Sequence, residues 1–252
     1  MWRDLAASRE LAWRLFVRDT SAQYRQSVFG YLWLFIPPLV ATAIWIFLNN
    51  QGVLKTGETA IPYGAYVLTG VLLWETFVSA LGMPNTMITG ATAMLTKIRF
   101  PYEALLLAGI YHVLFAIAVR LFLIVGVYLW YDVQPGTGLL FAPLGIFSIM
   151  LFGYTIGLLL VPLGVLYQDV PRLLTVVTGV WFFLTPVVSP PPTSWPGSLV
   201  VDWNPVSPLI MFARETLTGG PVTDPLPFMI VSVISAVCLV LAWVLYRTAM
   251  PH

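Results

Sequence analysis

The sequence predicts an all-α integral membrane protein with six transmembrane helices, an N-terminal amphipathic interface helix and short re-entrant gate helices on the outer side. Hydrophobic residues make up 59% of the chain and charged residues 9%, whereas roughly 25% of an average soluble domain is charged. Long apolar runs alternate with short polar breaks, and nearly all Lys and Arg lie in alternate breaks. This pattern is typical of a polytopic protein whose solvent is lipid.

The six expected spans follow from the length of these runs, because a membrane helix needs about 20 mostly apolar residues. The second, third and fourth runs exceed one crossing, so we expect them to tilt or to extend beyond the bilayer. The fifth is short and ends at a Pro-rich stretch. The six runs cover residues 31–50, 62–90, 102–130, 138–166, 173–189 and 226–246, and together they predict a single membrane domain over residues 1–252.

The orientation follows from the basic residues, which are retained on the cytoplasmic side of a membrane. With the N-terminus inside, the outer breaks hold only Lys55 and Arg214, and Arg120 falls within a span. All the other basic residues are then cytoplasmic, and both termini lie inside. The charged first thirty residues do not resemble a cleavable signal peptide.

Residues 8–27 look helical but are too charged to span. On a helical wheel Arg14, Arg18, Ser21 and Arg25 share one stripe, with apolar residues on both flanks. Such a helix suits the membrane interface, where it either anchors to anionic lipid or contacts protein. The second apolar flank favours a helix that also contacts protein.

Two of the breaks are unusual. The inner break 91–101 contains Lys97 and Arg99 and joins two long spans, so it either projects into the cytoplasm as a helical hairpin or is a simple retention loop. The outer break from Ser189 to Pro225 holds eight of the 20 prolines but is too apolar for a solvated loop. We expect short helices there that re-enter the outer leaflet, the clearest at about 207–218 before Gly219-Gly220.

The sequence lacks the residue patterns that form metal sites and nucleotide-binding sites in many enzymes. The only histidines are His112 and His252, so no metal site is expected, and no catalytic or cofactor-binding residues are predicted. Neither lysine fits a P-loop, because Leu54 precedes Lys55 and Thr96 precedes Lys97. If the protein does energised work, another chain hydrolyses the nucleotide.

Two charges and two rows of aromatic residues lie inside the predicted spans. Glu75 and Arg120 are close enough in depth to form a buried ion pair, which we favour over an ion or proton path. Aromatic rows such as those in the second and third spans suit either sugar rings or lipid and helix packing, and Glu75 points away from the first row. The candidate glycan-contacting residues are Tyr63, Tyr66, Trp74, Phe77, Tyr111 and Phe115.

Four sequence fragments in order resemble the membrane subunit of type-2 ABC exporters, in the branch that exports O-antigen, capsule and teichoic acid polysaccharides. The resemblance covers nearly the whole chain and departs from the family pattern at Gln168 and Ser189. The fragments are Leu15–Leu39 with its Arg-Asp, Tyr-Arg, Leu-Trp and Pro-Pro pairs, Lys97–Pro101, Gln168–Val170 followed by Leu184–Val188, and Asn204–Pro208 with Arg214 downstream.

The resemblance implies a transport subunit in the bacterial inner membrane that exports a lipid-linked polysaccharide and has no catalytic site of its own. The implied partners are a second copy of the chain, two copies of an ATPase subunit that binds ATP and Mg²⁺, the polysaccharide and membrane lipid, but no nucleic acid. Arg14, Arg18, Lys97 and Arg99 are then candidates for ATPase coupling, and Asn204, Pro205 and Arg214, in the 190–220 region, for the periplasmic gate. The alternatives are a drug or lipid exporter, a membrane-embedded glycan-modifying enzyme and a non-transporting scaffold.

Overall fold

The computed structural model describes the chain except residues 1, 26–27, 54–56, 58, 92–101, 135, 193, 221 and 250–252, and leaves the side chains of 2–7, 24–25, 102 and 249 undescribed. Every element within the described residues is a helix. In chain order they are α1 (Trp2–Arg25), the 3₁₀ helix η1 (Gly30–Leu34), α2 (Ile36–Asn50), α3 (Tyr63–Gly90), α5 (Tyr102–Trp130), the 3₁₀ helix η2 (Thr137–Phe141), α6 (Ala142–Leu166), α7 (Asp169–Leu184), α8 (Gly197–Trp203), α9 (Val206–Thr218) and α10 (Pro225–Ala249).

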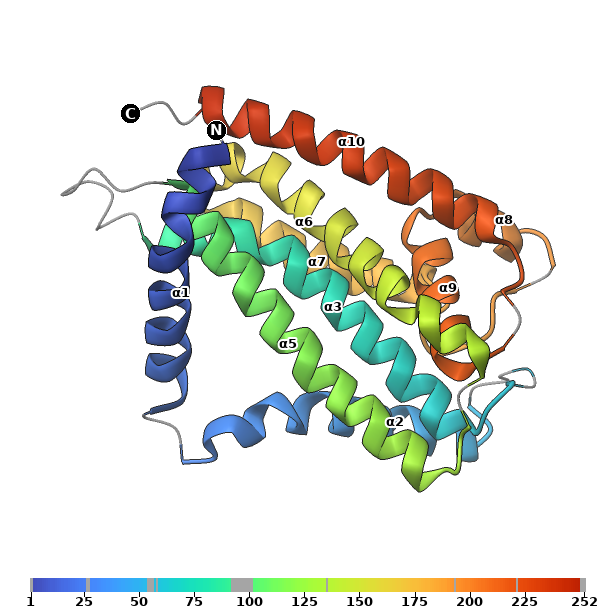
Figure 1. Cartoon of the computed structure of the whole chain (residues 1–252). Coiled ribbons are helices and arrows are strands. Elements are labelled where there is room, and N and C mark those ends of the chain that lie inside the picture. The colour runs from blue at the N-terminus through green and yellow to red at the C-terminus, as the bar shows by residue number, and fades with distance from the viewer. Residues whose placement is uncertain are drawn as a thin grey trace.

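Four long helices, α3, α5, α6 and α10, run side by side and form the body of the molecule (Figure 1). Among the described residues, these four are the helices long and apolar enough to cross a membrane. Four of the six predicted spans are therefore confirmed as helices of spanning length. With 15 and 16 residues, α2 and α7 fall short of the usual 20, so their crossing stays a prediction.

The short helices differ from the predicted spans for local reasons. The run predicted at 31–50 is divided between η1 and α2, and α2 has Pro in its first turn. The run predicted at 173–189 forms α7, which starts earlier, at Asp169, and ends at Leu184 because Thr185 is extended before Pro186. Asp169 lies in the first turn of α7, and Gln168 takes the cap position.

The core lies where α3 and α6 pack against each other. Gly153 and Gly157 of α6 meet backbone atoms of α3, so a Cβ at either position would overlap the carbonyl oxygens of Phe77 or Leu81. Small residues let two membrane helices approach this closely. The side chains around this contact, together with others from α5 and α9, form the largest buried apolar cluster among the described residues.

Helix α1 lies across one end of the long helices, near both termini, whereas α8 and α9 lie at the opposite end (Figure 1). It starts at Trp2, earlier than the predicted residue 8, and packs against α5. Ala12 and Leu15 are buried in this contact, whereas Arg14 and Arg18 are exposed. Thus the apolar face of α1 contacts the rest of the chain, and Arg14 and Arg18 of the basic stripe stay exposed.

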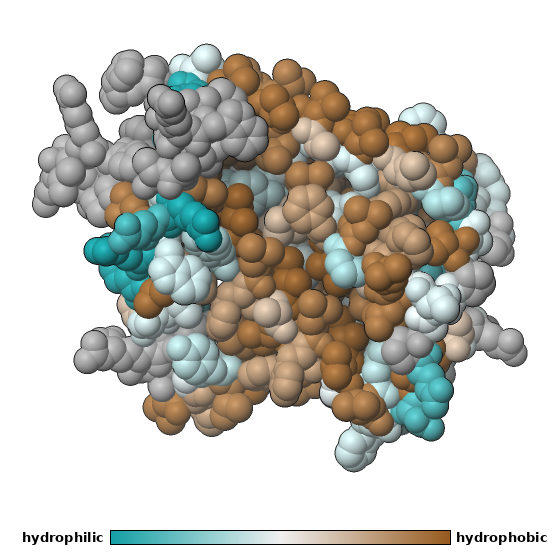
Figure 2. Space-filling model, viewed as in Figure 1, coloured by the Kyte–Doolittle hydropathy of each residue, from teal (hydrophilic) through white to brown (hydrophobic). Residues whose placement is uncertain are grey.

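The surface shows how the molecule would sit in lipid. In the view of Figure 2, apolar side chains cover the middle of the molecule, and hydrophilic side chains gather over α1 and at the opposite end. The exposed apolar side chains of α10, such as Val233, Val237 and Leu241, belong to this band. An apolar band between two polar rims is what a bilayer requires of a protein that spans it.

Candidate functional site

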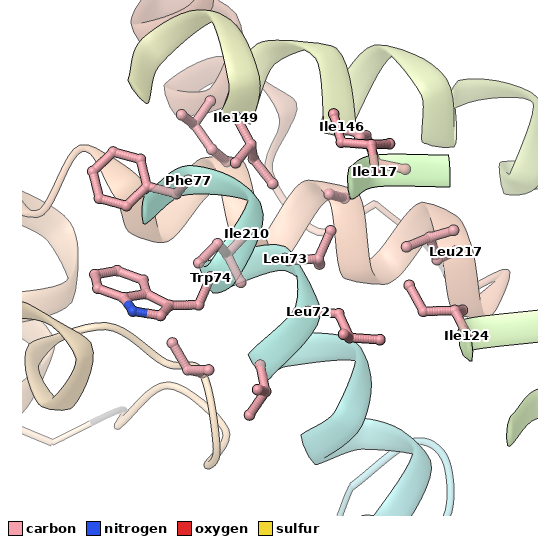
Figure 3. Close-up of a cluster of buried hydrophobic side chains, with 14 of the residues drawn as sticks. Leu72, Leu73, Trp74, Phe77, Ile117, Ile124, Ile146, Ile149, Ile210 and Leu217 are labelled. Atoms are coloured by element: carbon pink, nitrogen blue, oxygen red, sulfur yellow. The ribbon is translucent and has the colours of Figure 1, made fainter. Parts of the chain in front are cut away.

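The aromatic row of the second predicted span lies on α3, and we call it the aromatic stripe: Tyr63, Tyr66, Trp74 and Phe77. Its last two rings, Trp74 and Phe77, are buried inside the chain itself. Trp74 and Phe77 lie side by side on α3 (Figure 3), and Phe77 has no exposed surface. The Phe77 ring stacks on Phe152 of α6, with 5.8 Å between ring centroids, and meets the edge of Trp181 of α7 at 5.4 Å. These contacts support helix packing for Phe77, and its contact with glycan stays a prediction.

Tyr66, the second residue of the same stripe, contacts the candidate gate residue Arg214. The Arg214 guanidinium lies 4.0 Å from the centre of the Tyr66 ring, and its Nη1 donates to the Tyr66 hydroxyl. Arg214 also donates to the carbonyl oxygens of Pro186 at 2.9 Å and Val187 at 2.6 Å. Both carbonyls follow the end of α7, where no further helical turn can satisfy them. Arg214 thus fixes the end of α7 between α9 and α3.

We call the Arg214 contacts the Arg214 joint. Asn204 forms a second set of hydrogen bonds between α7 and α9 next to it. Its Oδ1 accepts hydrogen bonds from Trp181 Nε1 at 2.9 Å and Val206 N at 3.0 Å. Its Nδ2 donates to Thr185 Oγ1 at 2.8 Å and to the Leu184 carbonyl at 3.2 Å. Pro205 follows as the residue before α9. Asn204 and Arg214 therefore join the end of α7 to α9, and the role of the three candidate residues in gating stays a prediction.

The remaining predicted aromatic residues lie in α5 and in the first turn of α3. Tyr111 and Phe115 of α5 lie against α1, where Tyr111 meets Trp13 at 5.7 Å and Phe115 meets Phe16 at 6.0 Å. Tyr63, in the first turn of α3, is partly buried. Tyr111 and Phe115 therefore help to seat α1 on the bundle.

The candidate coupling residues are in part outside the described residues. Arg14 is exposed and pairs with Glu10 at 2.6 Å, and Arg18 pairs with Asp19 at 2.8 Å. Lys97 and Arg99 both belong to the stretch that the structure does not describe. Their place in a hairpin rests on the sequence.

The structure brings Glu75 and Arg120 together. Arg120 Nε lies 3.6 Å from Glu75 Oε2, and its Nη1 is 3.4 Å from Thr76 Oγ1. The pair is not enclosed, since the Glu75 side chain is 33% exposed and that of Arg120 16%. Both open onto a cavity of about 490 Å³ between α3, α5 and α7, which is lined by Trp74, Glu75, Val78, Ser79, Arg120, Thr175, Thr178, Gly179 and Phe182.

A second cavity of about 230 Å³ shares three of these residues and continues toward the α1 end of α3. It is lined by Val78, Leu81, Gly82, Asn85, Thr86, Pro171, Leu174, Thr175 and Thr178. We call the two cavities together the α3–α7 groove; most of its lining surface is apolar, and polar side chains are set into it. The sequence contained a signal for this groove, because Glu75, Ser79, Gly82 and Thr86 are spaced by four, three and four residues and so share one face of α3.

Comparison with known proteins agrees with the resemblance drawn from the motifs. The chain is 26% identical over 242 residues to the O-antigen export system permease protein RfbA of Myxococcus xanthus, which covers 94% of this chain and 91% of the relative. Two proteins of the same name from Klebsiella pneumoniae are 24% and 23% identical over 214 and 215 residues, each covering 81% of this chain and 78% of the relative. No family model matches the chain. The predicted resemblance to polysaccharide-export permeases is confirmed over nearly the whole length.

Proposed function

We propose that this chain is the membrane subunit of an ATP-driven exporter that carries an O-antigen-like, lipid-linked polysaccharide across the bacterial inner membrane. The observation that carries the proposal is the similarity to an O-antigen export permease over 94% of the chain. The helical fold supports it, because four helices have the length and composition of membrane spans. In this proposal α2 and α7 complete six crossings, and both termini are cytoplasmic.

The energy would come from a separate ATPase, present in two copies. Neither lysine of this chain lies in a P-loop, so ATP and Mg²⁺ would bind to the partner. The exposed Arg14 and Arg18 on α1 and the basic Lys97 and Arg99 in the 91–101 hairpin would form the surface that meets it. In this arrangement α1 lies on the cytoplasmic rim of the bundle.

A second copy of the chain would complete the transport path. Helices α2 and α7 are short, and each exposes apolar side chains such as Ile44 and Phe47 on α2 and Val176 and Val180 on α7. Exposed faces of this kind suit a partner helix. The segment 190–220 at the far end would form the periplasmic gate of this dimer.

A deletion strain tests the proposal. In a bacterium that lacks the gene for this chain, we expect O-antigen-type polymer to be absent from the cell surface and to accumulate on its lipid carrier inside. Expression of this chain together with its ATPase should restore surface polymer, and either protein alone should not. Normal surface polymer in the deletion strain, with a change only in drug resistance or in lipid distribution, would contradict the proposal and favour a drug or lipid exporter.

A further inference from the structure

We propose that the α3–α7 groove, between α3, α5 and α7, is water-filled within the membrane and is the surface of this chain that contacts the carbohydrate. The identity of the ligand rests on the proposed function, whereas the hydration of the groove does not. The proposal shifts the contact surface from the buried stripe of Tyr66 and Phe77 to the neighbouring face of α3.

The first argument is the exposure of charge at membrane depth. Glu75 lies twelve residues into α3 and Arg120 ten residues before the end of α5, which places them about 18 and 15 Å from those helix ends. A charged side chain at such depth is costly unless it faces a water-filled cavity or the bundle interior. Because the Glu75 side chain is 33% exposed, lipid chains in the groove would leave a carboxylate in hydrocarbon. Water in the groove removes this cost.

The second argument is that polar groups continue along the groove. The hydroxyls of Thr175 and Thr178 donate to carbonyls of their own helix at 3.1 and 2.8 Å, which leaves their oxygens able to accept a hydrogen bond from the groove. At its far end the groove is also lined by Asn85 and Thr86. Polar side chains therefore follow the whole length of the groove.

The third argument concerns the ligand. Glu75 and Arg120 neutralise each other, so the groove offers hydrogen bonds without net charge. The partly exposed Phe182 lines it as well, and its ring meets the largely buried Trp74 at 5.8 Å. A neutral sugar chain needs both features, because its hydroxyls form hydrogen bonds and its C–H faces pack on aromatic rings. An extended apolar drug or lipid tail would leave the ion pair and the hydroxyls without partners.

Cysteine accessibility tests the hydration of the groove. In a Cys238→Ser background, Ser79→Cys and Thr175→Cys would be compared with Val237→Cys, which lies twelve residues into α10 on its apolar face and is 57% exposed. The transporter with its ATPase, in lipid nanodiscs without substrate, would be treated with a charged methanethiosulfonate. We expect both groove cysteines to react at least about tenfold faster than Val237→Cys, because only water-facing thiols ionise readily. Rates equal to that of Val237→Cys would overturn the proposal.

A pair of glycine variants tests contact with carbohydrate. A Cβ at Gly179, in the groove, or at Gly126, on α5 outside it, meets no described atom within 4 Å. Gly179→Leu should therefore fold but narrow the groove and lower export of surface polymer about tenfold, since the width of a pore limits what passes. Gly126→Leu is the matched control and should export normally.

The outcomes separate this inference from the proposed function. If the groove cysteines react rapidly but Gly179→Leu exports polymer normally, the groove is hydrated and the carbohydrate contact is refuted. If the groove cysteines react rapidly but the unsubstituted protein exports no polysaccharide, the proposed function fails and the hydrated groove stands.

Discussion

At the scale of single residues, Arg214 shows how a charge can be held inside this fold. Its guanidinium donates hydrogen bonds to the carbonyls of Pro186 and Val187, which follow the end of α7. The sequence placed Arg214 among the gate residues but could not show this, because the carbonyls it meets lie 27 and 28 residues away. Contacts of this range depend on where α9 packs, and a local pattern does not contain that information.

Replacement of Arg214 tests this structural role. Arg214→Leu should lower the free energy of unfolding by about 2–4 kcal/mol, because it leaves two buried carbonyls without donors. Arg214→Lys should cost less, since a single ammonium can still reach one carbonyl. Thermal unfolding in detergent measures both, with the exposed Arg18→Leu as control. If Arg214→Leu is as stable as Arg18→Leu, the joint does not hold the end of α7.

The aromatic stripe provides a second test at this scale. The helical wheel correctly placed Trp74 and Phe77 on one face of α3, but a wheel cannot show what covers that face. Since Phe77 packs against α6 and α7, we expect Phe77→Ala to cost about 3–5 kcal/mol of stability through the cavity it leaves. Export should fall only in proportion to the amount of protein. A stable Phe77→Ala protein that fails to export would restore the stripe as a glycan surface.

The ion pair of Glu75 and Arg120 can be measured by a double-mutant cycle. Glu75→Gln and Arg120→Leu should each destabilise the protein, because each leaves the other charge unpaired in the membrane. The double variant should be milder than the sum, with a coupling energy of about 1 kcal/mol, as residues in contact usually show. Denaturant unfolding of the four proteins gives this value, and strict additivity would show that the pair does not interact.

At the scale of helices, periodicity and apolar length predicted the long spans well. The expected runs 62–90 and 102–130 match α3 and α5 to within one residue. The prediction was less accurate at α7, where the apolar run continued past Thr185-Pro186 but the helix did not. The length of an apolar run indicates which residues are stable in lipid. The residue at which a helix ends depends on backbone geometry, such as the restriction before a proline, which a count of apolar residues ignores.

The break between α3 and α5 yields a prediction about coupling. Replacing Lys97 and Arg99 together by Glu should weaken ATPase-driven export while the protein stays in the membrane, because the change reverses the charge at the expected contact with the partner. Export and substrate-stimulated ATP hydrolysis would be measured together. Since Lys97 and Arg99 also help to set the orientation of the chain in the membrane, accessibility labelling of loops on the two sides of the membrane must show an unchanged topology. Full export with intact topology would reject the coupling role.

At the scale of the whole molecule, the sequence predicted the class of protein better than it predicted the groove between α3, α5 and α7. Composition, spans and motifs indicated a resemblance to polysaccharide-export permeases, and the similarity to the relatives agrees with it. The groove was missed because its two walls come from α3 and α7, which are about 90 residues apart in the chain. One wall has a detectable spacing, but only the fold brings the second wall opposite it.

The division of labour between chains can be measured on the purified protein. We expect no ATP hydrolysis by this polypeptide alone, because neither lysine is part of a P-loop. Hydrolysis should appear when the partner ATPase is added and should disappear when the P-loop lysine of that partner is replaced. Sustained hydrolysis by the isolated chain would contradict a two-component exporter.

The Arg214 joint also determines the order in which the protein can be completed during synthesis. The Pro186 and Val187 carbonyls enter the membrane 27 or more residues before their donor has been made. Until α9 leaves the ribosome, the end of α7 must rely on water or on the insertion machinery for its hydrogen bonds. The far end of the bundle therefore closes only after residue 214 has been made. A nascent chain that stalls before residue 214 should expose this region to proteases, even though the membrane already holds the earlier spans.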